Sequence, residues 1–208
     1  MNEVDSERLA RLRNGVRESL PEVELIEDED LRAKVVEVHA LALLETGYDR
    51  IDDIPPSGVP ESPLMKRGSQ ADHYRGVATM ALGMAKGLED VLGGVGIDRD
   101  LLVAAALVHD VGKAYEFSSW NRWKDERSRT GSPSLRHPVY GAHLAISVGL
   151  PEEVVHCVAA HPYMGEGAFV KASLETTVVQ YADVAFWKVL DAGGLLEAEM
   201  DITGAPKR

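Results

Sequence analysis

The sequence of 208 residues is poor in cysteine and aromatic residues and contains no long apolar run. Its single cysteine, Cys157, excludes a disulfide between two residues of the chain and is typical of a reducing compartment. No apolar run approaches the ~20 residues that a membrane-spanning helix requires. The first residues, 1–7, carry neither the basic nor the apolar region of a secretory signal. We therefore expect a cytoplasmic protein with no membrane partner.

Positive charge is also scarce, with 22 Lys and Arg residues against 34 Asp and Glu residues and a net charge of −12. This balance argues against a nucleic-acid polymer as partner, because the phosphate backbone would be repelled. A small anionic substrate remains compatible, since a local basic pocket can oppose the overall sign. The length suits a single domain with a large core.

Apolar residues recur at helical spacing along most of the chain, and no segment alternates apolar and polar residues with a period of two. We therefore predict an all-α fold. The predicted helices cover residues 5–20, 30–47, 70–92, 98–110, 138–148, 151–161 and 173–191. Residues 48–68 hold four prolines, which is typical of a long irregular loop, and this loop could form one wall of a pocket.

The apolar run over residues 104–108 ends in His109 and Asp110, which Gly112 and Lys113 follow. Burying an imidazole and a carboxylate at the end of an apolar helix is costly unless a partner satisfies them. A metal ion does so, because both groups are ligands of Zn, Fe or Mn. Adjacent helical residues point roughly 100° apart, so we expect the helix to end here, with Gly112 as the break. The alternative is a core histidine beside a capping aspartate.

Other metal-capable side chains stand in or against apolar helical segments, where an unpaired polar group would be expensive. They are His73, His137, His161 and Asp183. Together with the segment that ends in His109 and Asp110, five segments share this unusual feature, which indicates a common site.

The remaining histidines and the cysteine are expected to be structural. His39 is more typical of a core or surface histidine than of a ligand. His143 and His156 lie six residues after and five before the two candidate ligands on their own helices, about 240° and 140° away from the ligand face. Cys157 is expected to be a small buried residue rather than a nucleophile.

This ordered set of residues resembles the HD-domain superfamily of metal-dependent phosphohydrolases, in its six-ligand variant, over about residues 70–190. The resemblance implies a helical bundle and one or two divalent ions, whose identity (Fe, Mn, Zn, Co or Mg) stays open. It implies a first ion held by His73, His109, Asp110 and Asp183, and a second held by His137 and His161 with Asp110 as the bridge. It also implies a division into an N-terminal helical extension with the loop (1–68), the HD metal-binding domain (69–192) and a tail (193–208).

Two features would bind the substrate. In similar HD enzymes a lysine in His-Asp-x-Gly-Lys faces the substrate, so Lys113 is expected to offer charge to an anionic oxygen, and Asp110 to help orient the water. Residues 114–136 form a local basic segment that also holds two tryptophans. We interpret it as a lid whose arginines, Arg122, Arg129 and Arg136, meet an anionic substrate, with a solvated surface loop as the alternative.

The leading hypothesis is a metal-dependent hydrolase of a small phosphorylated substrate, a nucleotide or a phosphomonoester, that uses a metal-activated water. A mixed-valent di-iron oxygenase of the same superfamily is the alternative, because the six-ligand pattern does not separate the two. Hydrolysis or hydration of a non-phosphate molecule, and a sensing module without turnover, also stay open. The N-terminal helices could pack on the bundle or form a homodimer contact, and their pattern does not decide.

Overall fold

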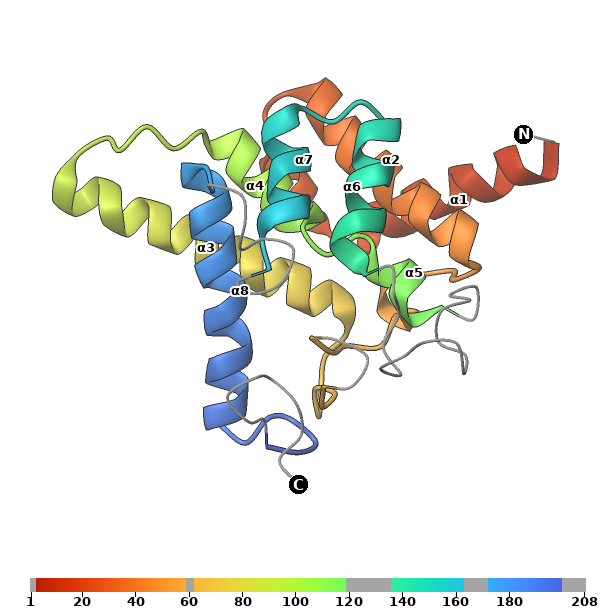
Figure 1. Cartoon of the computed structure of the whole chain (residues 1–208). Coiled ribbons are helices and arrows are strands. Elements are labelled where there is room, and N and C mark those ends of the chain that lie inside the picture. Colours follow the sequence, from red (N-terminus) through yellow and green to blue (C-terminus); the bar gives the residue numbers. More distant parts are fainter. Residues whose placement is uncertain (1–2, 59–61, 119–135, 163–171, 200–208) are drawn as a thin grey trace.

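The computed structural model describes residues 3–58, 62–118, 136–162 and 172–199. Within these ranges the chain is helical and forms no extended strand, as the all-α prediction requires (Figure 1). The elements are α1 (Glu3–Ser19), η1 (Pro21–Leu25), α2 (Glu29–Thr46), η2 (Ile51–Asp53), α3 (Gln70–Leu92), α4 (Arg99–Val108), α5 (Lys113–Phe117), α6 (His137–Ser147), α7 (Glu152–Ala160) and α8 (Leu174–Ala192). The helices predicted from periodicity agree with these bounds to within about two residues.

The short helix α4 is the centre of the bundle, with α2, α3, α7 and α8 packed around it. It begins where the Asp98 carboxylate accepts a hydrogen bond from the amide of Leu101 (3.0 Å). Residues 102–108 are all buried, so beyond its first turn no face of α4 meets solvent. A helix that is apolar all round is stable only inside a core. This placement carries the residues that follow α4 into the middle of the molecule.

Helices α1 and α2 pack against each other and against the bundle. Leu9, Leu12 and Val16 are buried on one face of α1, as their helical spacing predicts, and they belong to the same hydrophobic cluster as the residues of α4. His39 of α2 is also buried, and its Nε2 lies 2.8 Å from the carbonyl oxygen of Leu107. It is therefore a core histidine, as expected. The boundary at residue 68 stays a prediction.

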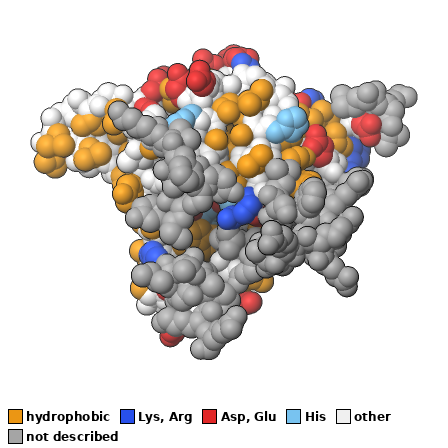
Figure 2. Space-filling model, in the orientation of Figure 1, with side chains coloured by type: hydrophobic (Ala, Val, Ile, Leu, Met, Phe, Trp, Pro, Cys, Tyr) orange, Lys and Arg blue, Asp and Glu red, His pale blue; other side chains and the backbone are white. Residues whose placement is uncertain are grey.

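The long helix α3 crosses α8, and beyond this crossing its C-terminal half projects from the bundle (Figure 1). Its start is fixed by a capping box, in which Ser69 and Asp72 bind each other's backbone amides. The projecting end exposes the apolar side chains of Leu88, Val91 and Leu92. Figure 2 shows hydrophobic side chains gathered at this end of the molecule.

The loop over residues 48–68 contains η2 and two isolated antiparallel bridges, Ser57 with Leu64 and Met65 with Leu196. The second bridge joins the loop to the start of the C-terminal tail. A small cluster of Met65, Trp187 and Leu196 forms beneath it. The loop is thus anchored by backbone pairing to the tail and by apolar contact with Trp187 of α8.

Candidate metal centre

Helix α4 ends at Val108, and residues 109–112 form turns. The helix does end at this point, as expected, but two residues before the predicted bound at residue 110, so His109 and Asp110 lie in the turn, where both side chains are buried. The expected reason was wrong, because Gly112 has φ −70° and is not a left-handed cap. A Cβ at Gly112 would instead lie 2.1 Å from the carbonyl oxygen of His137. Glycine is needed here so that the turn can approach the start of α6.

Four residues from α3, the end of α4 and α8 form a first cluster: His73, His109, Asp110 and Asp183. The Oδ2 atom of Asp110 lies 3.0 Å from Nε2 of His73 and 3.2 Å from Nε2 of His109. Oδ1 of Asp183 lies 3.4 Å and 3.9 Å from the same two nitrogen atoms. Each of the four residues offers one ligand atom, and these atoms lie within 4.8 Å of one another.

A second cluster shares Asp110 and adds His137, at the start of α6, and His161, directly after α7. Oδ1 of Asp110 lies 3.2 Å from Nε2 of His137 and 3.4 Å from Nε2 of His161. The two histidine Nε2 atoms are 3.4 Å apart. Asp110 therefore directs one carboxylate oxygen to each cluster.

The histidines are held by hydrogen bonds on their far side. Nδ1 of His109 lies 2.7 Å from the carbonyl oxygen of Ala106, and Nδ1 of His161 lies 3.0 Å from that of Val158. A carbonyl oxygen only accepts, so in both residues Nδ1 carries the proton. In the neutral imidazole Nε2 then presents a lone pair to the cluster, which is the form that binds a metal.

Two of these buried ligand atoms make no hydrogen bond to the part of the protein that the structure describes. Within the described ranges, Nε2 of His109 and Oδ1 of Asp183 are buried without a hydrogen bond. Buried polar atoms without partners are costly. A divalent cation in each cluster would satisfy them, and the combination of imidazole nitrogen and carboxylate oxygen suits Fe, Zn or Mn. The residues present therefore fit metal ions.

Charge at the centre favours an ionised Asp110 and a neutral His73, whereas at His109 the negative charge of Asp110 outweighs burial and raises the pKa. Burial pushes the pKa of Asp110 upward, but the positive charge of Lys113 and the neighbouring histidines outweigh it and hold this pKa well below its usual range. Burial lowers the pKa of His73 to about 4, so its ring is neutral at pH 7. Both are the protonation states of metal ligands.

Lys113 is buried beside the first cluster. Its Nζ lies 2.7 Å from Oδ2 of Asp110 and donates a hydrogen bond to the carbonyl oxygen of Ser57 (2.9 Å). It also lies 5.6 Å from the centre of a Trp187 ring. The loop over residues 48–68 thus contributes a wall to the site through Ser57. Sequence patterns gave no signal for Ser57 or Trp187, because both reach the site only through the packing of the loop on α8.

The other residues singled out from the sequence have distinct places. Arg136 pairs with the buried Glu116, with 3.1 Å between Nε and Oε1. His143 is exposed on α6, and neither it nor His156 belongs to a metal-capable cluster in the described ranges. Cys157 is fully buried, and burial raises the pKa of its thiol to about 12. The predicted lid residues Arg122 and Arg129, with the tryptophans at positions 120 and 123, lie outside the described residues.

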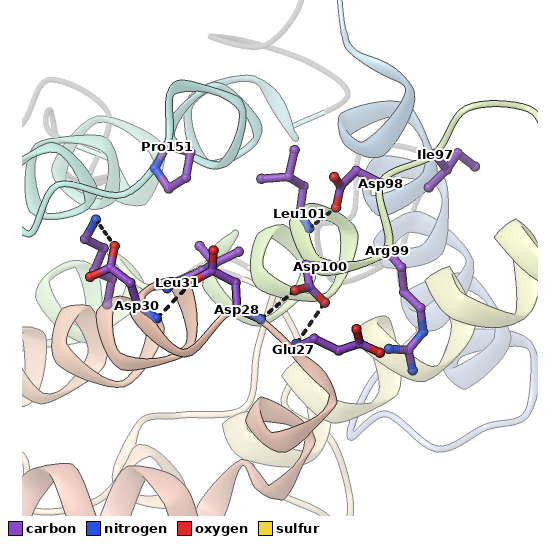
Figure 3. Close-up of a pocket in the computed structure, with 11 residues that line it drawn as sticks. Glu27, Asp28, Asp30, Leu31, Ile97, Asp98, Arg99, Asp100, Leu101 and Pro151 are labelled. Atoms are coloured by element: carbon purple, nitrogen blue, oxygen red, sulfur yellow. Dashed lines mark hydrogen bonds and ion pairs between the residues drawn. The ribbon is translucent and has the colours of Figure 1, made fainter.

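A separate surface pocket of about 630 Å³ lies between the starts of α2 and α4 (Figure 3). Two of its carboxylates already have structural roles. Asp28 caps α2 through the amides of residues 30 and 31, and Asp100 accepts hydrogen bonds from the amides of Glu27 and Asp28. None of the unpartnered buried side-chain atoms in the described ranges belongs to a residue that lines it. The metal centre is the stronger candidate for chemistry.

The chain matches the HD domain family over residues 71–201, which is more than half of its length. A curated relative, the dihydroneopterin 2',3'-cyclic phosphate phosphodiesterase of Methanocaldococcus jannaschii, is 32% identical over 181 residues. This similarity covers 81% of the present chain and 67% of the relative. No solved structure matches the chain significantly.

The helical bundle, the two histidine and aspartate clusters and these matches define the class. The chain belongs to the HD domain family. It is a metal-dependent phosphohydrolase of that family. No helix in the described part of the chain has the length and apolar character needed to cross a membrane.

Proposed function

We propose that this protein hydrolyses a phosphate ester of a small molecule at a centre of two divalent ions. The observation that carries the proposal is the orientation of Asp110, whose two carboxylate oxygens face two different clusters. The first ion would be held by His73, His109, Asp110 and Asp183, and the second by Asp110, His137 and His161. Two ions at such a centre lower the pKa of a water molecule and neutralise the oxygens of an anionic substrate.

The residues around the clusters would bind and orient the phosphate. The Lys113 ammonium group has three N–H donors, and the contacts to Asp110 and Ser57 account for two of them. The third is available for a phosphate oxygen, where negative charge grows during hydrolysis. Because Lys113 is buried, it is poorly screened by water and its charge acts strongly on such an oxygen.

The substrate class rests on the relative, which is named for a cyclic phosphate diester. We therefore propose a small phosphodiester, in particular a cyclic phosphate on two neighbouring hydroxyl groups, ahead of the phosphomonoesters that the sequence also allows. Arg136, and Arg122 and Arg129 outside the described residues, are proposed to meet the anion. The net charge of −12 favours a small substrate over a nucleic-acid polymer.

The test is turnover by the full chain after chelation and reloading with Mn, Co, Zn or, without oxygen, Fe(II). The probes are adenosine 2',3'-cyclic phosphate, bis-p-nitrophenyl phosphate and p-nitrophenyl phosphate, with His109→Ala as the blank. We expect metal-dependent opening of the cyclic phosphate to a monophosphate, or release of p-nitrophenol from the aryl esters, at equal rates with and without oxygen. Activity that survives in His109→Ala, or turnover that requires oxygen, would contradict the proposal.

A further inference from the structure

Glu116 is a fully buried carboxylate on α5 that no sequence pattern singled out. Its Oε2 atom accepts a hydrogen bond from Nδ1 of His137 (2.7 Å), and its Oε1 atom pairs with Nε of Arg136 (3.1 Å). The close approach of Gly112 to the start of α6 brings α5 within reach of His137. Both carboxylate oxygens are thus engaged, and the carboxylate is fixed behind the His137 ring.

This contact sets His137 apart from the other histidines of the two clusters. His109 and His161 donate from Nδ1 to neutral backbone carbonyls, and Nδ1 of His73 has no hydrogen-bond partner in the described ranges. Within the described ranges, His137 alone has a carboxylate at the ring nitrogen that faces away from the clusters. A carboxylate behind a ligating imidazole fixes the tautomer and orientation of the ring and raises the basicity of the opposite nitrogen.

The charge of the two clusters gives a reason for this difference. The first cluster contains Asp183 as well as the bridging Asp110, whereas the second has no carboxylate of its own within the described ranges. Two neutral imidazoles and a shared carboxylate neutralise a divalent cation poorly. Glu116, whose other oxygen pairs with the partly exposed Arg136, places a carboxylate one hydrogen bond behind the second cluster.

We propose that Glu116 is a positioning residue that gives the second cluster its affinity for a metal ion. The inference rests on the proposed two-ion function. It distinguishes the two ions, because loss of Glu116 weakens the second and leaves the first nearly unchanged. Glu116 acts through His137 and does not itself touch substrate or metal.

The experiment is a calorimetric titration of the metal-free full chain with Mn²⁺, comparing the wild type with Glu116→Gln. Glutamine keeps the size and an acceptor oxygen but removes the charge. We expect the second binding event to weaken by about 10- to 100-fold, with less than a threefold change in the first. The matched control is Glu175→Gln, which alters another buried carboxylate, one that accepts a hydrogen bond from the amide of Asp98. Both binding events should persist in it.

A general structural role for Glu116 would lower the affinity of both events together, and this result would overturn the inference. Unchanged affinities in Glu116→Gln would also overturn it. If the wild type binds a single ion, the two-ion function itself fails, and the inference fails with it, so the two failures are distinguishable. Should Glu116→Gln not fold, Glu116→Asp keeps the charge for Arg136 but is too short for His137. The same selective loss is expected of that variant, and equal losses in both events would count against the inference.

Discussion

The α carbon of Gly112 lies so close to His137 that an added Cβ would stand 2.1 Å from its carbonyl oxygen and 2.7 Å from the amide nitrogen of Gly141. Both neighbours are backbone atoms, so neither can rotate away. Gly112→Ala must therefore separate α5 from α6. We expect it to destabilise the fold by about 1–3 kcal/mol or more and to weaken metal binding at the second cluster. Urea unfolding and Mn²⁺ titration measure the two effects.

The matched control is Gly83→Ala, because Gly83 lies within α3 and a Cβ there would meet no atom within 4 Å. Alanine is the better helix former, so this variant should be more stable than the wild type by about 0.5–1 kcal/mol. If Gly112→Ala unfolds at the same urea concentration as the wild type, the close approach of α5 and α6 is not essential.

Removing the bridging carboxylate should affect both ions, whereas removing the terminal one should affect one. We expect Asp110→Asn to bind neither Mn²⁺ ion and Asp183→Asn to retain one Mn²⁺ ion per chain. Elemental analysis after gel filtration counts the bound ions. Asp110→Asn should also be the less stable variant, because it leaves the buried Lys113 without its carboxylate. Breaking a buried pair in this way costs about 3–5 kcal/mol. Equal stoichiometry in the two variants would argue against a bridge.

Lys113 is expected to act on the substrate and not on the metal. Lys113→Met keeps a long side chain but removes the charge, so kcat on a cyclic phosphate should fall by about 10²–10³. The metal content should stay at the wild-type value. Lys86→Met is the control, since Lys86 is an exposed lysine that pairs with Asp90 on its own helix. A kcat within threefold of the wild type would show that Lys113 has no such role.

His39 should make the metal-free protein less stable in mild acid. Burial lowers its pKa to about 4, whereas the unfolded value is near 6.5. The unfolded chain therefore binds more protons between these values, and stability is full above pH 6.5 and falls as the pH drops toward 4. The loss from His39 between pH 7 and pH 5 should be about 2 kcal/mol. His39→Gln can still donate to Leu107 but does not titrate, so urea unfolding of this variant should show a correspondingly shallower pH dependence.

Much of the fold and most of the metal centre could be predicted from local patterns. The helix bounds followed from apolar periodicity, because this pattern is set by residues three or four positions apart in the chain. The candidate ligands stood out because each is a polar group in an apolar helix, and the structure brings all six into two adjoining clusters. The role of Gly112 was misread, since its requirement comes from α6, 25 residues further along the chain.

The sequence by itself determined which side chains are available for metal binding and which helices carry them, because the spacing of apolar residues along the chain predicts both the helices and their buried faces. Only the tertiary structure decided how they are shared: one oxygen of Asp110 for each cluster, Glu116 behind His137, and Lys113 between Asp110 and Ser57. These pairings depend on distances between helices that are remote in the chain, and packing sets those distances.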